Sequence, residues 1–113
     1  MDLVEQIYRV TSGFPQDERF GLTAQIRRAA VSVPSNIGEG SRRKRRKVFV
    51  HHLDVALGSQ GEVDVQLEIA QRLRYLKMAD YRHTQRAVEE IGRMLNGLII
   101  SLEPNAEDEP ADY

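Results

Sequence analysis

The chain has 113 residues, the length of a single domain, and its 41% apolar and 29% charged residues are ordinary for a globular protein. It contains no cysteine, which excludes disulfides, thiolate metal sites and cysteine nucleophiles. No run approaches the ~20 apolar residues that a membrane span needs, and the acidic start at residues 1–5 is unlike a signal peptide. We therefore expect a cytoplasmic protein that does not contact a membrane.

The formal net charge of -1 conceals an uneven distribution of charge along the chain. Residues 103–113 hold five acids and no base, so residues 1–102 carry all 16 Lys and Arg against 12 acids. Six cations are consecutive, and we call them the basic segment: Arg42, Arg43, Lys44, Arg45, Arg46 and Lys47. The distribution predicts one folded domain at 1–102 and an acidic, disordered tail at 103–113.

The first half of the chain predicts two helices. A short one fits residues 3–10 and ends before Ser12. The second begins at Leu22, and its apolar residues recur in steps of three and four, as one helical stripe requires: Leu22, Ile26, Ala29, Ala30, Val33 and Ile37. Gly38 and Gly40 indicate its end, and Pro34, which cannot donate to the carbonyl of Ala30, should bend or loosen its last turn.

A third, long helix is predicted from Lys47 to about Leu76, roughly 45 Å at ~1.5 Å per residue. Its seam alternates steps of four and three through Phe49, Leu53, Ala56, Gln60, Val63, Leu67 and Ala70. Val50, Leu57, Ile69 and Leu73 are expected to widen this apolar face.

Two glycines interrupt the third helix in the stretch Gly58, Ser59, Gln60 and Gly61. Each should cost up to ~1 kcal/mol relative to alanine in an exposed helix. Glycine permits close approach of another backbone, so we expect this stretch at a close contact with another helix or subunit. Gln60, on the seam, should be a buried polar group with a hydrogen-bond partner.

The last periodic segment runs through Thr84, Val88, Ile91, Leu95, Leu98 and Leu102, and Pro104 stops it. Four helices without a convincing strand predict an all-α fold, an antiparallel up-down four-helix bundle. Its connections should lie near residues 12–20, 40–45 and 76–81.

The sequence offers little for catalysis. Asn36 and Glu39 in the turn "NIGEG" are interpreted as partners for backbone groups freed by Pro34 and the helix end. A catalytic Glu39 would need a partner and a pocket. His51 and His52 point ~100° apart on a helix, unlike the zinc-binding i, i+4 pair. We expect no enzyme, metal or cofactor.

Three stretches carry a family resemblance: "FPQDERFGLTAQIRRAAVSVPSNIGEG", Phe49, and "LDVALGSQGEVDVQLEIAQRL" at 53–73. From about Leu3 to Leu76 the chain resembles the four-helix-bundle proteins encoded in intervening sequences of bacterial 23S ribosomal RNA genes. The resemblance implies a homopentameric ring. One relative in that group, the accessory protein of diversity-generating retroelements, is a basic pentamer that works with a reverse transcriptase and RNA. The partners implied are therefore other copies of the chain, RNA or DNA, and a reverse transcriptase or another protein.

The chain departs from that family pattern in two places. Its first helix looks about a turn short. Arg45 and Val48 stand where the family tends to have a Ser or Thr and a Glu, so the usual N-cap of the third helix is lost unless Ser41 caps an earlier start. Cations at a helix N-terminus oppose the macrodipole by ~0.3–1 kcal/mol each.

The basic segment has two interpretations. It is either a solvated charge run or a phosphate-binding patch, which cyclic symmetry would repeat as a belt. Its cations lack a local acidic partner in sequence, and no aromatic residue is interleaved with them to stack on bases. Arg27 and Arg28 could extend the patch, although Arg28 could instead pair with Glu39 or Glu62. We expect a non-enzymatic oligomeric module that binds nucleic-acid backbone, or else a protein–protein scaffold.

Overall fold

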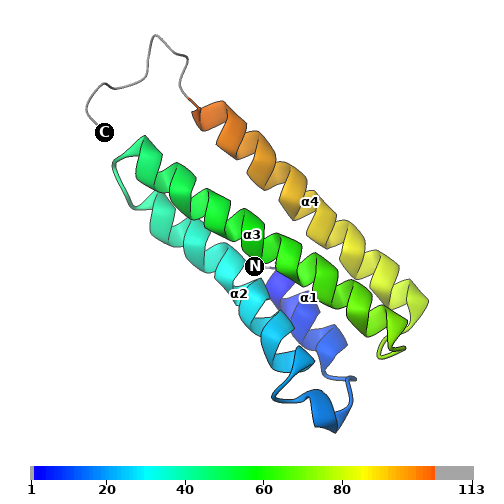
Figure 1. Cartoon of the computed structure of the whole chain (residues 1–113). Coiled ribbons are helices and arrows are strands. Elements are labelled where there is room, and N and C mark those ends of the chain that lie inside the picture. Colours follow the sequence, from blue (N-terminus) through cyan, green and yellow to red (C-terminus); the bar gives the residue numbers. More distant parts are fainter. Residues whose placement is uncertain (1, 104–113) are drawn as a thin grey trace.

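The computed structural model describes residues 2–103, which form four α-helices and one short 3-10 helix (Figure 1). The helices are α1 (Asp2–Thr11), α2 (Leu22–Ser41), α3 (Arg46–Arg72) and α4 (Met78–Leu102), with the 3-10 helix η1 (Gln16–Glu18) between the first two. Residues 2–103 contain no strand. The predicted all-α class is therefore confirmed, while the predicted acidic tail lies, except for Glu103, outside the described residues.

Successive helices run antiparallel, and each packs on two neighbours (Figure 1). α2 contacts α3, α3 contacts α4, and α1 lies between α2 and α4, whereas no Cα atoms of the diagonal pairs, α1–α3 and α2–α4, come within 8 Å of each other. α1 has only 10 residues against 27 in α3, so it covers only part of the length of the bundle. The remaining part is a three-helix arrangement of α2, α3 and α4.

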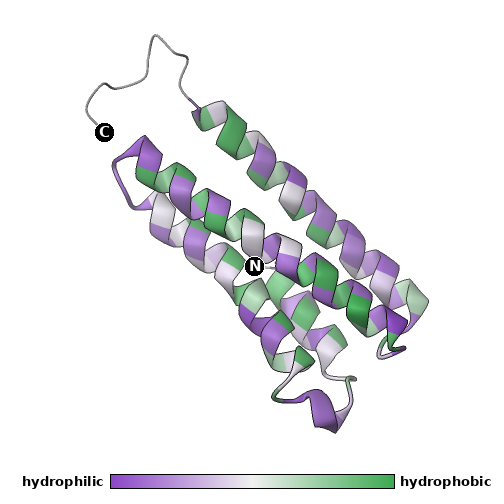
Figure 2. Cartoon of the chain, viewed as in Figure 1, coloured by the Kyte–Doolittle hydropathy of each residue, from purple (hydrophilic) through white to green (hydrophobic). Residues whose placement is uncertain are grey.

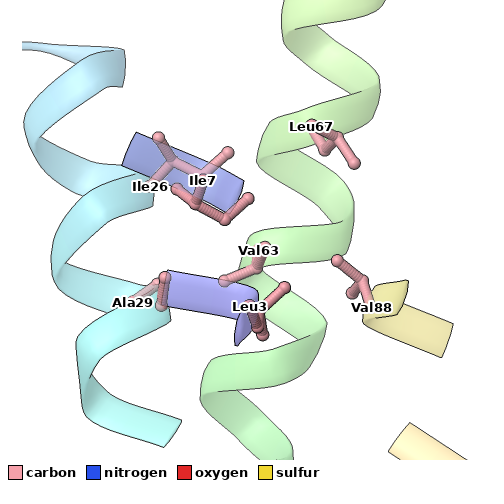
Figure 3. Close-up of a cluster of buried hydrophobic side chains, with 8 residues drawn as sticks. Leu3, Ile7, Ile26, Ala29, Val63, Leu67 and Val88 are labelled. Atoms are coloured by element: carbon pink, nitrogen blue, oxygen red, sulfur yellow. The ribbon is translucent and has the colours of Figure 1, made fainter. Parts of the chain in front are cut away.

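The core consists of two clusters that follow this division. The first, drawn in Figure 3, joins α1 to the other helices through side chains that include Ile7, Ile26, Val63, Leu67 and Val88. The second joins α2, α3 and α4 through Val33, Leu53, Ala56, Leu95 and Ile99. The predicted seam of α3 is confirmed at Leu53, Ala56, Val63, Leu67 and Ala70, all fully buried. Figure 2 shows the result, with apolar bands alternating with polar ones along each helix.

α2 is longer than predicted. It includes Pro34 and continues through Gly38 and Gly40 to Ser41. A proline removes one intrahelical hydrogen bond, and a glycine weakens a helix without ending it, so packing on α3 can carry the helix past all three residues. The predicted helix end therefore agrees with the structure at Gly40, one residue before Ser41, whereas Gly38 lies within the helix.

α3 ends at Arg72, not near Leu76. The turn that ends it contains no glycine, so the sequence does not indicate it. Arg74 adopts the left-handed conformation (φ 63°), and its N–H donates to the carbonyl of Gln71 at 2.9 Å. The N–H of Tyr75 donates to the carbonyl of Ala70, also at 2.9 Å, which completes a Schellman cap. Ile69 and Leu73, predicted to widen the apolar face, are instead exposed.

α4 begins at Met78, six residues before the predicted stripe. Its first three residues are exposed and contribute nothing to the apolar period. The connection between α3 and α4 therefore comprises residues 73–77, earlier in the chain than the predicted residues 76–81.

Candidate nucleic-acid interface

The basic segment lies at the end of the bundle where α2 ends, α3 begins and α4 also ends (Figure 1). Residues 42–45 form the connection, while Arg46 and Lys47 open α3. All six side chains are exposed. The structure thus places the predicted cations together on one end, where a large anion has access to them.

Arg43 corrects one sequence-based expectation about these cations. Its guanidinium forms an ion pair with Glu39, one turn earlier in α2, and both groups are exposed. The statement that the segment has no local acidic partner was therefore wrong for Arg43. Within residues 2–103, the side chains of Arg42, Lys44, Arg45 and Arg46 form no hydrogen bond or ion pair.

The N-terminus of α3 has no side-chain cap. Arg45 occupies the N-cap position and makes no capping hydrogen bond. The hydroxyl of Ser41 donates to the carbonyl of Gly38 at 2.9 Å, so the alternative that Ser41 caps α3 was wrong. An uncapped helix N-terminus presents backbone N–H groups and the positive end of the helix dipole, and both attract anions.

Behind the basic segment, a polar contact joins the last turns of α2 to the first turns of α3. The Nδ1 atom of His52 lies 3.2 Å from Oδ1 of Asn36, whose amide nitrogen donates to the carbonyl of Ser32 at 2.9 Å. Pro34 frees the carbonyl of Ala30, not that of Ser32, so Asn36 does not replace the missing helix bond as predicted. It links two helices instead.

Gly40 allows these two helices to approach closely. A Cβ atom built there would lie 2.6 Å from Cβ of His52 and 2.9 Å from Cδ1 of Phe49. Gly40 was predicted only to mark the end of the second helix, and it lies one residue before that end. Its effect is to bring the start of α3 against α2 and so to position the basic segment.

The stretch at residues 58–61 is only partly as predicted. The Nε2 atom of Gln60 donates to the carbonyl of Val88 at 3.0 Å, which confirms a partner for this residue. Ser59 is buried and its hydroxyl donates to Oγ of Ser32 at 2.8 Å. However, a Cβ at Gly58 or Gly61 would meet no other part of the described chain within 4 Å. The glycine that admits Gln60 is Gly92 of α4, where a Cβ would lie 2.7 Å from Nε2.

Arg27 and Arg28 do not extend the basic segment. The Nε atom of Arg27 donates to Oγ1 of Thr11 at 2.8 Å, and its guanidinium lies over the ring of Tyr8, so it holds α1 to α2. Arg28 lines a separate polar groove between α2 and α3, about 280 Å³ in volume, that sequence reasoning missed. The groove is lined by Gln25, Arg28, Ala29, Ser32, Ser59, Glu62 and Gln66.

Neither a metal site nor a membrane span is found among residues 2–103. No three His, Asp or Glu side chains in this part of the chain lie close enough together to hold a metal ion. None of its helices combines the length and the apolar composition that crossing a bilayer requires.

The fold and the exposed cations define a small all-helical protein with a basic end. The sequence pattern of the 23S rRNA-intervening sequence protein family matches residues 1–97, and the chain belongs to this family. Its fold is similar to the crystal structure of a protein of unknown function from the S23 ribosomal protein family of Bacteroides thetaiotaomicron VPI-5482. That similarity has a TM-score of 0.78 at 24% identity and covers 87% of this chain and 88% of the other. A comparison with curated proteins gave no match.

Proposed function

We propose that the protein is a non-enzymatic, oligomeric module that binds the phosphate backbone of RNA or DNA through the basic segment. The observation that carries this proposal is the exposure of six consecutive cations beside an uncapped helix N-terminus. Phosphate oxygens accept hydrogen bonds from guanidinium groups and from free backbone N–H groups, so one end of the bundle offers both kinds of donor.

Binding at this end should depend little on base sequence. Residues 41–47 contain no aromatic side chain that could stack on a base. Contacts to phosphate position a protein on a nucleic acid without reading its sequence. Affinity should therefore follow the number of phosphates neutralised and should fall steeply with salt.

The proposal is tested by measuring binding of a fluorescent RNA duplex and a single strand at several salt concentrations. The logarithm of the binding constant should fall with that of the salt by about 0.9 per duplex phosphate neutralised, or about 0.7 for single strands. Replacing Arg42, Arg43, Arg45 and Arg46 by Gln should flatten the slope. Gln keeps helix propensity close to that of Arg, so helical content should not change.

The matched control replaces four exposed arginines elsewhere, Arg9, Arg19, Arg82 and Arg86, by Gln. It removes the same charge from the whole protein and should retain most of the slope. Equal slopes for both quadruple variants would refute the basic segment as the binding surface. No detectable binding by the parent at ~50 mM salt, where such contacts are strong, would refute nucleic-acid binding and favour a protein–protein scaffold.

Self-association is the second part of the proposal. The family pattern supports a homopentameric ring, which would present the basic segment five times and multiply its contacts with one polyanion. A reverse transcriptase or another protein is the further partner that this kinship suggests. The mass of the particle in solution, measured by light scattering, tests the assembly directly against the 12.9 kDa of one chain.

A further inference from the structure

The polar groove between α2 and α3 has the size and the charges of a site for a small molecule. Its volume of about 280 Å³ lies close to the lower end of the ~300–1,000 Å³ that small-molecule sites occupy. Arg28 brings one positive charge to it from α2, and Glu62 brings one negative charge from α3. In the described part of the chain neither side chain forms an ion pair or a hydrogen bond, so both charges are available to a ligand.

The amide of Gln66 adds an acceptor that lacks a donor. Its Oε1 atom is buried and accepts no hydrogen bond from any group of residues 2–103. Gln66 lies one turn after Glu62 in α3, so the two residues offer acceptor oxygens to the same groove. A buried acceptor without a donor costs free energy, which a bound N–H group would recover. The α3 wall therefore favours a ligand group that is cationic and donates hydrogen bonds.

A hydrogen bond between two serines joins the walls of the groove and leaves a donor on the α2 wall. The hydroxyl of Ser59 donates to Oγ of Ser32 at 2.8 Å, and Nδ2 of Asn36 donates to the same oxygen at 3.1 Å. A hydroxyl has two acceptor lone pairs and one proton, so Oγ of Ser32 is saturated as an acceptor. Its own proton has no acceptor among the described residues. Ser32 and Arg28 can therefore both donate to an anionic group of a ligand.

We infer that this groove binds a free amino acid with an uncharged polar side chain. The carboxylate of the amino acid lies against Arg28 and Ser32, and its ammonium group lies against Glu62 and Gln66. A simple anion is repelled by Glu62 and a simple cation by Arg28, whereas a zwitterion matches both charges. A nucleobase does not fit, because none of the described side chains that line the groove is aromatic and could stack on it.

The test is calorimetric titration with L-serine, L-asparagine and L-glutamine of the particle that the chain forms in solution. At least one of the three should bind with a dissociation constant of about 1 mM or below. The tightest binder is then compared with one analogue that lacks its ammonium group and one that lacks its carboxylate. For L-glutamine these are glutaramic acid and γ-aminobutyramide. Each analogue should bind at least about tenfold more weakly, because one charge of the groove stays unmatched.

Four single variants locate the binding. Arg28→Gln and Glu62→Gln should each weaken binding of the amino acid at least about tenfold. Both side chains are exposed, so circular dichroism should show the helical content of the parent. The controls Arg93→Gln and Glu90→Gln remove the same charges from an exposed ion pair on α4 and should bind the amino acid as the parent does.

Gln66→Met separates binding from packing. Met is similar to Gln in length, but it removes the buried acceptor that has no donor in the described chain. The variant should therefore unfold at a higher temperature than the parent and yet bind the amino acid more weakly. A purely structural role of Gln66 would not move these two measurements in opposite directions.

Three results would overturn the inference. The first is no binding of any of the three amino acids up to about 10 mM, which is also expected if another copy of the chain covers the groove. The second is equal affinity of the parent, Arg28→Gln and Glu62→Gln, and the third is equal affinity for either analogue. The basic segment is separate from the groove, so Arg28→Gln should change RNA binding no more than Arg93→Gln does. RNA binding therefore tests the proposed function independently of this site.

Discussion

At the scale of single residues, Arg74 ends α3 at a conformational cost. Its φ of 63° lies in the left-handed region, where a side chain is unfavourable by ~1–2 kcal/mol and glycine is not. Arg74→Gly should therefore raise the free energy of unfolding by about 0.5–1 kcal/mol, since glycine also gains freedom in the unfolded chain. Thermal unfolding checks this. The control Arg82→Gly, in the exposed interior of α4, should lower stability by up to ~1 kcal/mol.

Tyr75, the next residue, makes a pH-sensitive contact with η1. Its hydroxyl donates to Oε2 of Glu18 at 2.8 Å, and the other carboxylate oxygen, Oε1, accepts the N–H of Leu22 at 3.1 Å. The hydrogen bond to Glu18, followed by partial burial and the charges of Glu18 and Asp17, raises the pKa of Tyr75 above its ordinary value of 10.0. A raised pKa means that the folded protein favours the protonated phenol.

The stabilisation from this contact should be fully present below pH 10.0 and lost as the pH rises through the raised pKa. Tyr75→Phe should accordingly be less stable than the parent at neutral pH, and the difference should shrink at higher pH. In an absorbance titration, Glu18→Gln should bring one tyrosine to ionise at a lower pH than in the parent. A stability difference that did not change with pH would contradict this account.

At the scale of the helices, the contact of α2 with α3 depends on the absence of a side chain at Gly40. A Cβ there would lie 2.6 Å from Cβ of His52, an atom held next to the α3 backbone. Gly40→Ala should therefore lower the free energy of unfolding by about 1–3 kcal/mol, as overpacking does. Gly97→Ala is the control, because its Cβ meets nothing and helix propensity should raise stability by up to ~1 kcal/mol. Denaturant unfolding of both variants decides whether Gly40 is a packing residue.

The packing of α2 on α3 also shows which parts of the helices could be predicted from the sequence. Residues in steps of three and four located the helices and most of the core, since burial of one side repeats with the helical period. A glycine that admits a neighbouring helix looks the same in sequence as one that ends a helix, so the packing roles of Gly40 and Gly92 were not predicted. Arg74 carries no signal for a left-handed turn. The exposed first turn of α4 has no apolar period to find.

Of the candidate sites, the basic segment could be predicted from the sequence and the polar groove could not. The six consecutive cations can be recognised from the sequence alone, and the structure adds only that they share one exposed end of the bundle. The polar groove was missed because its walls come from two helices, and residues such as Arg28 and Glu62 are 34 positions apart. Nothing in either helix alone indicates that the two side chains line one groove without pairing.

At the scale of the whole molecule, the chain leaves the bundle at the end that carries the basic segment (Figure 1). Residues 103–113 hold five acids: Glu103, Glu107, Asp108, Glu109 and Asp112. They are tethered to the end of α4, so their local concentration near the six cations is high. We therefore expect them to compete with phosphate for the basic segment.

Removing residues 104–113 should strengthen RNA binding at low salt and have little effect at high salt, where ions screen the competition. The deletion removes four of the five acids. Helical content should not change, because α4 ends at Leu102. A variant that keeps the length but replaces these acids by Gln and Asn should bind as tightly as the deletion, since charge rather than bulk is the cause. Binding that is unchanged in both variants would show that the acids do not screen the basic segment, and tighter binding by the deletion alone would point to steric hindrance.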